Sequence, residues 1–205
     1  MTSGGLRQLC QQLIVEGRER LSRPPRFMEF ARILEADKLL NNLDEYPHAF
    51  VIACIMDRQM SAEKAWRIPY NLREAVGCFD FATLAGLTES YLRQVMSGPP
   101  ALHRFPETMA KNLYSALRRI EAQYGGDASM IWVGRHSSAT IVRRFLEFDG
   151  VGQKIATMAA NILVRDFRIP VSDRYSIDMS VDVQVRRVFT RMGFVPDNAS
   201  AELAP

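Results

Sequence analysis

The amino-acid sequence predicts an all-α protein, and three observations lead to this fold class. Apolar residues recur at helical spacing, as at Leu6, Leu9 and Leu13 near the N-terminus. Prolines and glycines separate these stretches, and the Pro24-Pro25 pair ends the first of them. No run of residues has the alternation of apolar and polar side chains that is typical of a strand, and no segment is repeated.

The N-terminal half is expected to form helices around one buried helix. Residues 49–56, AFVIACIM, are apolar on every side, so they should lie at the centre of the core. At Asp57-Arg58-Gln59 the pattern turns polar, which brings the end of this helix to a surface or a cleft. The predicted helices cover residues 6–21, 27–43, 48–66 and 70–76.

The C-terminal half continues with shorter helices joined by turns. Thr88 stands where an N-cap belongs, and Pro106 stands at a first helical position. Residues 168–181 are expected to form a connector, and the small, polar tail from Val195 is expected to be disordered. The predicted helices cover residues 81–85, 89–96 and 106–124, a short stretch near Met130, a pair on either side of Gly150, and residues 183–192.

The composition, the cysteine spacing and the apolar runs indicate which classes of partner, cofactor and location to expect. The chain has 205 residues, 47% of them hydrophobic, and a net charge of +3, which permits a polyanionic partner without requiring one. Cys10, Cys54 and Cys78 are far apart, so we expect no disulfide framework, cysteine zinc site or iron–sulfur cluster. The three histidines show no metal-ligand spacing either, and no metal or cofactor is expected. The longest apolar run is too short to cross a bilayer, and we expect a cytoplasmic protein.

Residues 145–162, FLEFDGVGQKIATMAANI, are the most informative stretch. One helical pattern runs into Asp149, two glycines bracket Val151, and a second helical pattern leaves from Gln153. Glycine lets the backbone take positive φ, and the N–H groups that begin the second helix, together with its dipole, form a site for a phosphate. Lys154 lies in the first turn of that helix. We interpret the stretch as a helix–hairpin–helix that grips a nucleic-acid backbone, while a tight connection without a ligand remains the alternative.

A second informative stretch is SVDVQVRRV at residues 180–188. Asp182 precedes an apolar-periodic helix and stands at its N-cap position. A capping role alone, with a contribution of about 1 kcal/mol, would account for an aspartate there.

Together the two stretches resemble the helix–hairpin–helix DNA glycosylase superfamily, and most closely its endonuclease III branch. The family pattern proline-glycine-valine-glycine-X-lysine-threonine-alanine reads FDGVGQKIA at 148–156, and the family's valine-aspartate-threonine-histidine segment reads VDVQVRRVFTRMGF at 181–194. A weaker match is ACIMDRQ at 53–59, which is similar to the family helix that ends in a glutamine facing the DNA.

The resemblance implies a role for each matched residue. Lys154 would be the Schiff-base nucleophile and Asp182 the essential carboxylate. Gly150, Val151 and Gly152 would hold the DNA backbone through main-chain N–H groups, and Gln153 at the start of the helix is expected to bind DNA with them.

The resemblance also implies contacts with the opened duplex. Gln59 would fill the gap left by a flipped nucleotide, and its neighbour Arg58 is expected to contact DNA. His103, Arg104 and Phe105 lie near where the family places a residue wedged into the duplex, so each is a candidate and Arg104 is expected to bind DNA. Aromatic residues such as Trp66, Tyr70 and Trp132 could stack on an extruded base, although core packing is the commoner role for such residues.

The chain departs from the family pattern in several places. Asp149 replaces the usual proline and puts a carboxylate beside the expected phosphate grip. Extra residues separate Lys154 from Asp182, and among them Asp173 is the alternative carboxylate, although only Asp182 has the helix-opening context. Gln184 stands where the family often has histidine. The cluster cysteines and closing helices of the family are not found, so we expect a second lobe that is incomplete or built differently.

The resemblance predicts a two-lobe glycosylase fold with the hairpin at the interlobe cleft. Residues 46–166 would form a helical barrel that carries the hairpin, and residues 1–45 with 167–205 would form the lobe that carries Asp182. The expected function is removal of a damaged base from double-stranded DNA, with β-elimination at the abasic site through a lysine Schiff base. The protein is expected to act as a monomer, associated with the nucleoid or, in a eukaryote, located in the nucleus. The alternatives are a monofunctional glycosylase and a non-catalytic DNA-binding module.

Overall fold

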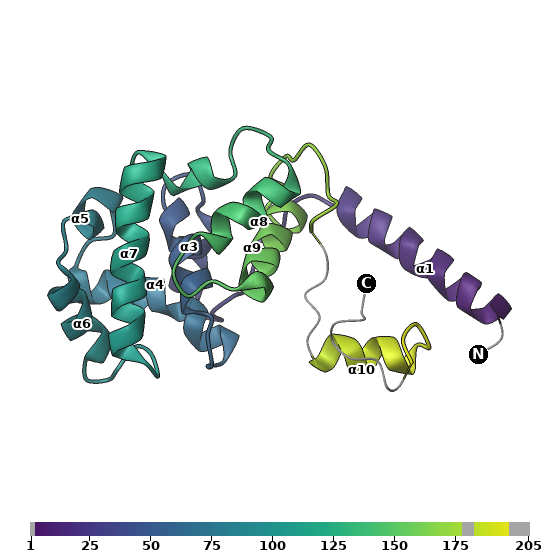
Figure 1. The fold of residues 1–205 in the computed structure, drawn as a ribbon, viewed down its shortest axis with the longest axis horizontal. Coiled ribbons are helices and arrows are strands. Elements are labelled where there is room, and N and C mark those ends of the chain that lie inside the picture. Colours follow the sequence, from purple (N-terminus) through teal and green to yellow (C-terminus); the bar gives the residue numbers. More distant parts are fainter. Residues whose placement is uncertain (1–2, 178–182, 197–205) are drawn as a thin grey trace. The chain divides into compact units, whose positions relative to one another are not determined.

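The computed structural model describes residues 3–177 and 183–196. Within these ranges the regular structure is helical without a strand, as Figure 1 shows, so the predicted all-α class is confirmed. Contacts divide the chain into two units, Phe27–Ile177 and Met1–Arg26 with Asp178–Pro205. The predicted lobe boundaries stay a prediction.

The larger unit contains most of the helices. They are α2 (Leu34–Asn41), α3 (Pro47–Met56), α4 (Ala62–Val76), α5 (Phe81–Ala85), α6 (Glu89–Ser97), α7 (Pro106–Tyr124), the 3₁₀ helix η1 (Ala128–Ile131), α8 (Ser138–Leu146) and α9 (Gln153–Arg165). The smaller unit contains α1 (Ser3–Ser22) and α10 (Val183–Arg191).

Helix α3 is the centre of the larger unit, as its apolar sequence predicts. Every residue of α3 is buried, and the helix contacts α2, α4, α7, α9 and η1. The ring of Phe50 meets those of Trp66, Trp132 and Phe145 edge to face, with centroids 5.6, 6.1 and 6.4 Å away. Burial of such side chains stabilises the fold by about 1.5–3 kcal/mol each. The two tryptophans therefore belong to the core and do not face a ligand.

The prediction of one helix over residues 48–66 is wrong, because α3 ends at Met56 and α4 begins at Ala62. Tight backbone hydrogen bonds close α3, from Asp57 N to Cys54 O at 3.2 Å and from Arg58 N to Met56 O at 2.7 Å. Gln59 then takes a φ of 51°, which an α-helix does not allow. The helix predicted at 70–76 is the second half of α4, which continues through Pro69.

The prediction of a helix over residues 27–43 is also wrong in its first part, because α2 begins only at Leu34. Side chains of α2 bind the main chain of the preceding segment and compete with helical hydrogen bonds there. The carboxylate of Asp37 accepts from Ala31 N at 2.7 Å, and the amide of Asn41 exchanges two hydrogen bonds of 2.9 Å with the main chain of Met28.

Cap residues mark the starts of several other helices of the larger unit, including the predicted cap Thr88 and the predicted first residue Pro106. The side chains of Asp80, Thr88 and Ser137 accept hydrogen bonds from backbone N–H groups at the starts of α5, α6 and α8. Helix α7 begins at Pro106 and ends at Gly125, whose φ of 62° is left-handed. Helix α7 packs against α3, α5 and α6, and this packing fixes the position of the face it turns toward the hairpin.

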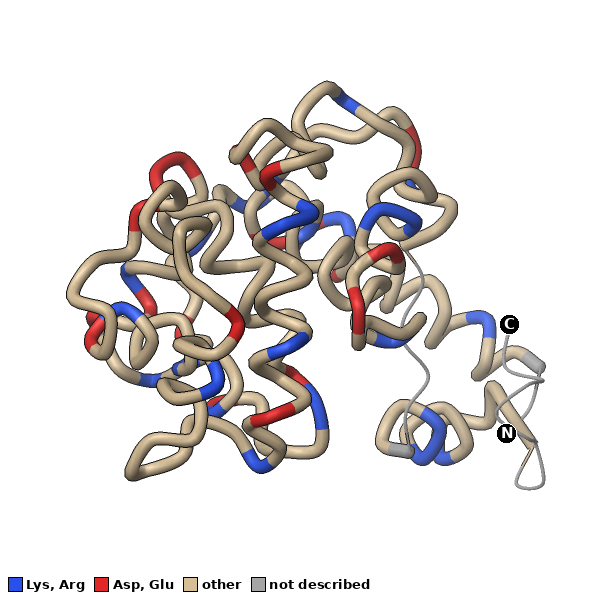
Figure 2. Tube along the Cα trace, turned by 60° about the vertical axis from the view of Figure 1, so that its left-hand side comes forward, with Lys and Arg blue, Asp and Glu red and all other residues tan. Residues whose placement is uncertain are grey.

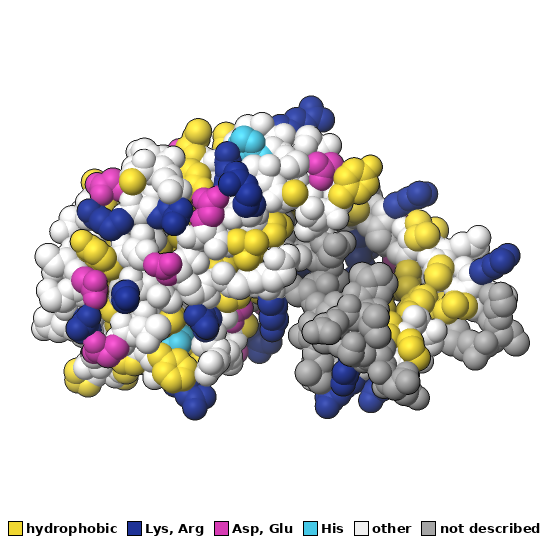
Figure 3. Space-filling view, viewed as in Figure 1, with side chains coloured by type: hydrophobic (Ala, Val, Ile, Leu, Met, Phe, Trp, Pro, Cys, Tyr) yellow, Lys and Arg dark blue, Asp and Glu magenta, His cyan; other side chains and the backbone are white. Residues whose placement is uncertain are grey.

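In the smaller unit, Leu13, Ile14 and Val15 of α1 are exposed hydrophobic residues. Figure 3 shows hydrophobic side chains, in yellow, along this helix. Helix α10 begins at Val183, close to its predicted start, and carries arginines without an acidic residue, as Figure 2 shows. No helix in the described part of the chain is long and apolar enough to cross a membrane.

Candidate functional site

The predicted hairpin is present between α8 and α9. Val151 N donates to Phe148 O at 3.0 Å and closes the turn, and the Val151 side chain is buried. Gly150 has a φ of 85°, as the turn requires. Gly152 does not take positive φ: with φ −99° and ψ 177° it is the extended N-cap residue of α9.

Helix α7 braces this turn from behind. A Cβ added at Gly150 would overlap the Nδ2 atom of the buried Asn112 and would lie 3.1 Å from Nη1 of Arg58. Ser115, one turn after Asn112, donates from Oγ to Oδ2 of Asp149 at 2.6 Å. The carboxylate that replaces the usual proline is therefore hydrogen-bonded to α7, and Gly150 is fixed between two polar side chains.

The start of α9 has the features of an anion site. The first helical hydrogen bond runs from Ala156 N to Gly152 O at 3.0 Å, so the N–H groups of Gln153, Lys154 and Ile155 precede it, and Gly152 provides no side-chain cap. A Cβ added at Gly152 would meet no atom within 4 Å, so the turn is open on this side. The Gln153 amide turns back along the helix and donates to Oγ1 of Thr157 at 3.3 Å.

Lys154 lies with its side chain exposed in the first turn of α9, at the end of α3. Asp57 is the half-buried C-cap residue of α3, and its carboxyl interacts electrostatically with the charge of Lys154. Burial raises the pKa of the Asp57 carboxyl above its ordinary value, and the positive charge of Lys154 lowers it. The resemblance assigns no role to Asp57, although an acid placed directly after ten buried residues is a signal in the sequence that could identify it.

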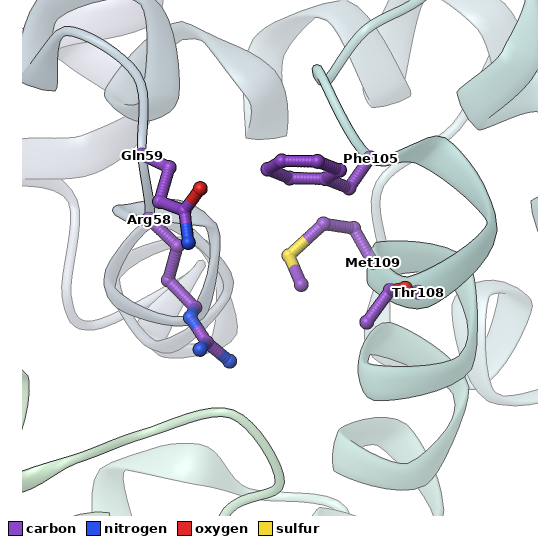
Figure 4. A pocket seen from close by; sticks show the side chains of 5 residues that line it. All are labelled: Arg58, Gln59, Phe105, Thr108 and Met109. Carbon is purple, nitrogen blue, oxygen red and sulfur yellow. The ribbon is translucent and has the colours of Figure 1, made fainter.

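The Arg58-Gln59 segment lines a pocket of about 200 Å³ together with Phe105, Thr108 and Met109. Figure 4 shows the Gln59 amide and the Phe105 ring on opposite sides of this pocket, while the Arg58 side chain extends away from them. The segment after α3 and the start of α7 thus bring together two residues that the resemblance assigns to the opened duplex.

The three candidates for the wedge differ in exposure. His103 is 3% exposed and accepts at Nδ1 from Phe105 N at 3.0 Å. Burial lowers its pKa, the main chain of Met56 and Arg58 raises it, and the charge of Arg58 lowers it. His103 therefore supports the segment after α3 from inside. Arg104 is exposed and places its guanidinium 5.3 Å from the centre of the Phe105 ring, which is itself 39% exposed.

Of the two candidate catalytic carboxylates, the structure describes Asp173 but not Asp182. Asp182 lies outside the described residues, directly before α10, so its role stays a prediction. Asp173 accepts from Oγ of Ser138, the first residue of α8, at 2.7 Å and from Tyr175 N at 3.2 Å. These hydrogen bonds, that from Ser138 above all, lower its pKa. Because α8 and α9 run antiparallel through the hairpin, Asp173 lies at the end of the pair opposite to Lys154, which does not support it as the partner of that lysine.

The fold and the braced hairpin define the class of this protein as an all-helical protein with a helix–hairpin–helix. Residues 52–204 match the model of the HhH-GPD superfamily base excision DNA repair protein. The chain belongs to the HhH-GPD superfamily, which confirms the family that the sequence indicated. No curated protein sequence matches the chain.

Two solved structures are similar to this chain. One is a trapped endonuclease III–DNA covalent intermediate in an estranged-adenine complex, with 17% identity, a TM-score of 0.51, and 87% of this chain and 80% of that chain covered. The other is Clostridium acetobutylicum 8-oxoguanine glycosylase/lyase in complex with double-stranded DNA containing cytosine opposite to 8-oxoG, with 17% identity and a TM-score of 0.53. That match covers 94% of this chain and 66% of the glycosylase. Both likenesses establish the fold.

Proposed function

We propose that this protein is a monomeric DNA glycosylase that removes a damaged base from double-stranded DNA and cleaves the abasic site through Lys154. One observation carries the proposal: the hairpin at Gly150, braced by α7, holds an uncapped helix start and an exposed lysine at one edge, beside the acid that ends α3. Membership of a base excision repair superfamily and the fold of two DNA-bound structures support it.

The hairpin would bind the phosphate backbone. The N–H groups of the first turn of α9 and the positive end of its dipole favour an anion there. The side of Gly152 that meets no neighbouring atom would let a phosphate approach the main chain closely. The hydrogen bond from Ser115 would hold the Asp149 carboxylate toward α7 during binding.

The duplex would be opened at the pocket of Gln59 and Phe105. Extrusion of a base costs a few kcal/mol, and a side chain that fills the gap offsets this cost. Phe105 is exposed and adjoins the pocket, whereas His103 is buried, so Phe105 is the better wedge. Gln59 would face the nucleotide that loses its partner.

The chemistry would use one amine and one acid. The neutral Nζ of Lys154 would attack the sugar C1′, the bond from C1′ to the base would break, and the base would leave with the bonding electrons and take up a proton. The nitrogen then loses a proton, the bond from C1′ to O4′ breaks with protonation of O4′, and the resulting imine permits β-elimination of the 3′ phosphate. The carboxylate of Asp182 would stabilise the positive charge that develops on the sugar ring.

Borohydride trapping on a duplex with one abasic site tests the proposal. Reduction of the imine should give a covalent protein–DNA adduct, and Lys154→Ala should abolish it. Lys38→Ala is the matched control, because Lys38 lies on α2 in an ion pair of 2.8 Å with Glu35 and has no proposed role. Retention of the adduct in Lys154→Ala, or its loss in Lys38→Ala, would contradict the assignment.

A panel of duplexes with oxidised, deaminated or alkylated bases separates the remaining alternatives. New abasic sites without an adduct would indicate a monofunctional glycosylase. Salt-dependent binding without either activity would indicate a DNA-binding module that uses the hairpin only to hold the backbone.

A further inference from the structure

A second pocket lies at the other end of the hairpin pair. It has a volume of about 470 Å³ and is built by the segment before α8, the last turn of α9 and the connector that follows. The residues that line it are Arg135, Val164, Arg168, Ile169, Pro170, Val171 and Arg174. We call it the arginine pocket. Val164 follows Lys154 by ten residues in α9, which places the pocket about 15 Å along the helix from that lysine.

The charged side chains that line the arginine pocket are all positive. Three arginines line it, and none of the lining residues that the structure describes is an aspartate or glutamate. The acids nearest in sequence are engaged with other groups. Asp166 is buried and pairs with Arg165 at 2.8 Å, and Asp173 accepts from Ser138 and from Tyr175 N. The carbonyl end of α9 offsets part of this positive charge, so the attraction for an anion comes from the three guanidinium groups.

The backbone holds two of the arginines in an uncommon conformation. Arg135 has a φ of 54° and Arg168 a φ of 60°, in the left-handed region that residues with a Cβ rarely adopt. Ser172 N donates to His136 O at 3.0 Å and ties the connector to the segment that carries Arg135. The two segments therefore bring Arg135 and Arg168 to one pocket.

The rest of the lining is apolar and suits the remainder of a nucleotide. Val164, Ile169, Pro170 and Val171 offer carbon surface against which a sugar or a base can pack. The volume lies within the range of small-molecule sites, about 300–1,000 Å³. Guanidinium groups bind phosphate through paired hydrogen bonds. Tyr175, next to Arg174, is 87% exposed and could stack on a base.

We propose that the arginine pocket binds a phosphorylated nucleoside, with its phosphate on the guanidinium groups of Arg135 and Arg174 and its sugar and base on the apolar wall. The nucleotide is either free or part of a DNA strand. The pocket lies apart from Lys154, so this binding is independent of the proposed lyase chemistry.

Calorimetric titration of the full-length protein with 2′-deoxyadenosine 5′-monophosphate tests the proposal. Arg174→Ala and Arg135→Ala should each weaken binding about tenfold, the effect of one lost charge-assisted hydrogen bond. Arg73→Ala is the matched control, since Arg73 lies on α4 and pairs with Glu74. Deoxyadenosine and inorganic phosphate should each bind more weakly than the nucleotide. Circular dichroism checks that each variant is folded.

The outcomes separate the two sources of the nucleotide. If the pocket holds a DNA strand, Arg174→Ala should lower the slope of log affinity for DNA against log salt concentration by about one. An unchanged slope with loss of nucleotide binding indicates a free nucleotide. Absence of nucleotide binding, equal affinity in both pocket variants and wild type, or phosphate binding as tight as that of the nucleotide would overturn the proposal. Lys154→Ala should bind the nucleotide as wild type does, whatever borohydride trapping shows.

Discussion

The charge of Lys154 acts on the carboxyl of Asp57 across the junction between the end of α3 and the start of α9. Burial raises the pKa of Asp57, and the lysine lowers it. The same junction brings Arg58 within 3.1 Å of the Cβ position of Gly150. Charged groups at the end of the most buried helix and at the hairpin thus interact directly, although about one hundred residues separate them in the sequence.

Asp57→Asn is expected to increase the rate of borohydride trapping at pH 6 by about twofold to fivefold, because removal of a nearby carboxylate favours the neutral, reactive amine. The pH–rate profile of trapping checks this prediction. Glu45→Gln is a suitable control, since Glu45 is an exposed acid that lies before α3 and has no proposed role. Slower trapping in Asp57→Asn would contradict the prediction and indicate that the carboxylate accepts the proton of the amine.

Gly150→Ala is expected to destabilise the fold by at least about 1–2 kcal/mol. The residue at this position has a left-handed φ, and an added Cβ would overlap the side chain of Asn112. Gly152→Ala is the matched change, since Gly152 has negative φ and a Cβ there meets open space. Its free energy of unfolding should change by less than about 1 kcal/mol, while its affinity for DNA falls. Urea denaturation and a DNA-binding titration of both variants measure the two effects. Equal destabilisation by the two substitutions would contradict the assignment.

Much of this arrangement follows from local sequence. The apolar run 49–56 predicts the buried helix, and the glycine pair predicts the hairpin because Gly150 takes the positive φ that the turn requires. The caps at Thr88 and Pro106 place helix starts correctly. The two wrong boundaries, at residues 27–33 and 57–61, arise where long-range side-chain contacts or a left-handed residue override helical periodicity.

The contacts that assemble the site could not be predicted from the sequence in the same way. Asn112 and Ser115 lie on α7 and meet the hairpin only after the chain folds, so no local pattern marks them. Asp57 had a local signal, an acid after a buried helix, but its relation to Lys154 depends on how α3 packs on α9. The pocket between Gln59 and Phe105 likewise depends on tertiary packing.

Asp149→Asn is expected to tighten binding to DNA by about twofold to fivefold at low salt, because it removes a negative charge beside the proposed phosphate site. An asparagine in this position can still accept the hydrogen bond from Ser115. The gain should shrink as salt screens the charge. Titrations at two salt concentrations test this, and Glu45→Gln, an exposed acid before α3, should leave the affinity unchanged.

Stability is expected to fall as the pH drops from about 7 to 5, because burial lowers the pKa values of His48 and His103 below the ordinary value of about 6.5. In that window the unfolded chain binds more protons than the folded one, so the free energy of unfolding rises with pH. His48→Gln and His103→Asn should each reduce this slope. Denaturation curves at several pH values measure it, and an unchanged slope in both variants would contradict the prediction.

Phe105→Ala is expected to slow excision of a damaged base by about tenfold or more, because extrusion of the base then lacks the side chain that fills the gap. Trapping at an existing abasic site should fall less, since no base has to be extruded there. Tyr91→Ala is a matched control, because Tyr91 on α6 is 38% exposed and Phe105 is 39% exposed. Single-turnover excision and borohydride trapping of the two variants separate the steps. An equal loss of both activities in Phe105→Ala would indicate a general role in DNA binding, and unchanged excision would exclude Phe105 as the wedge.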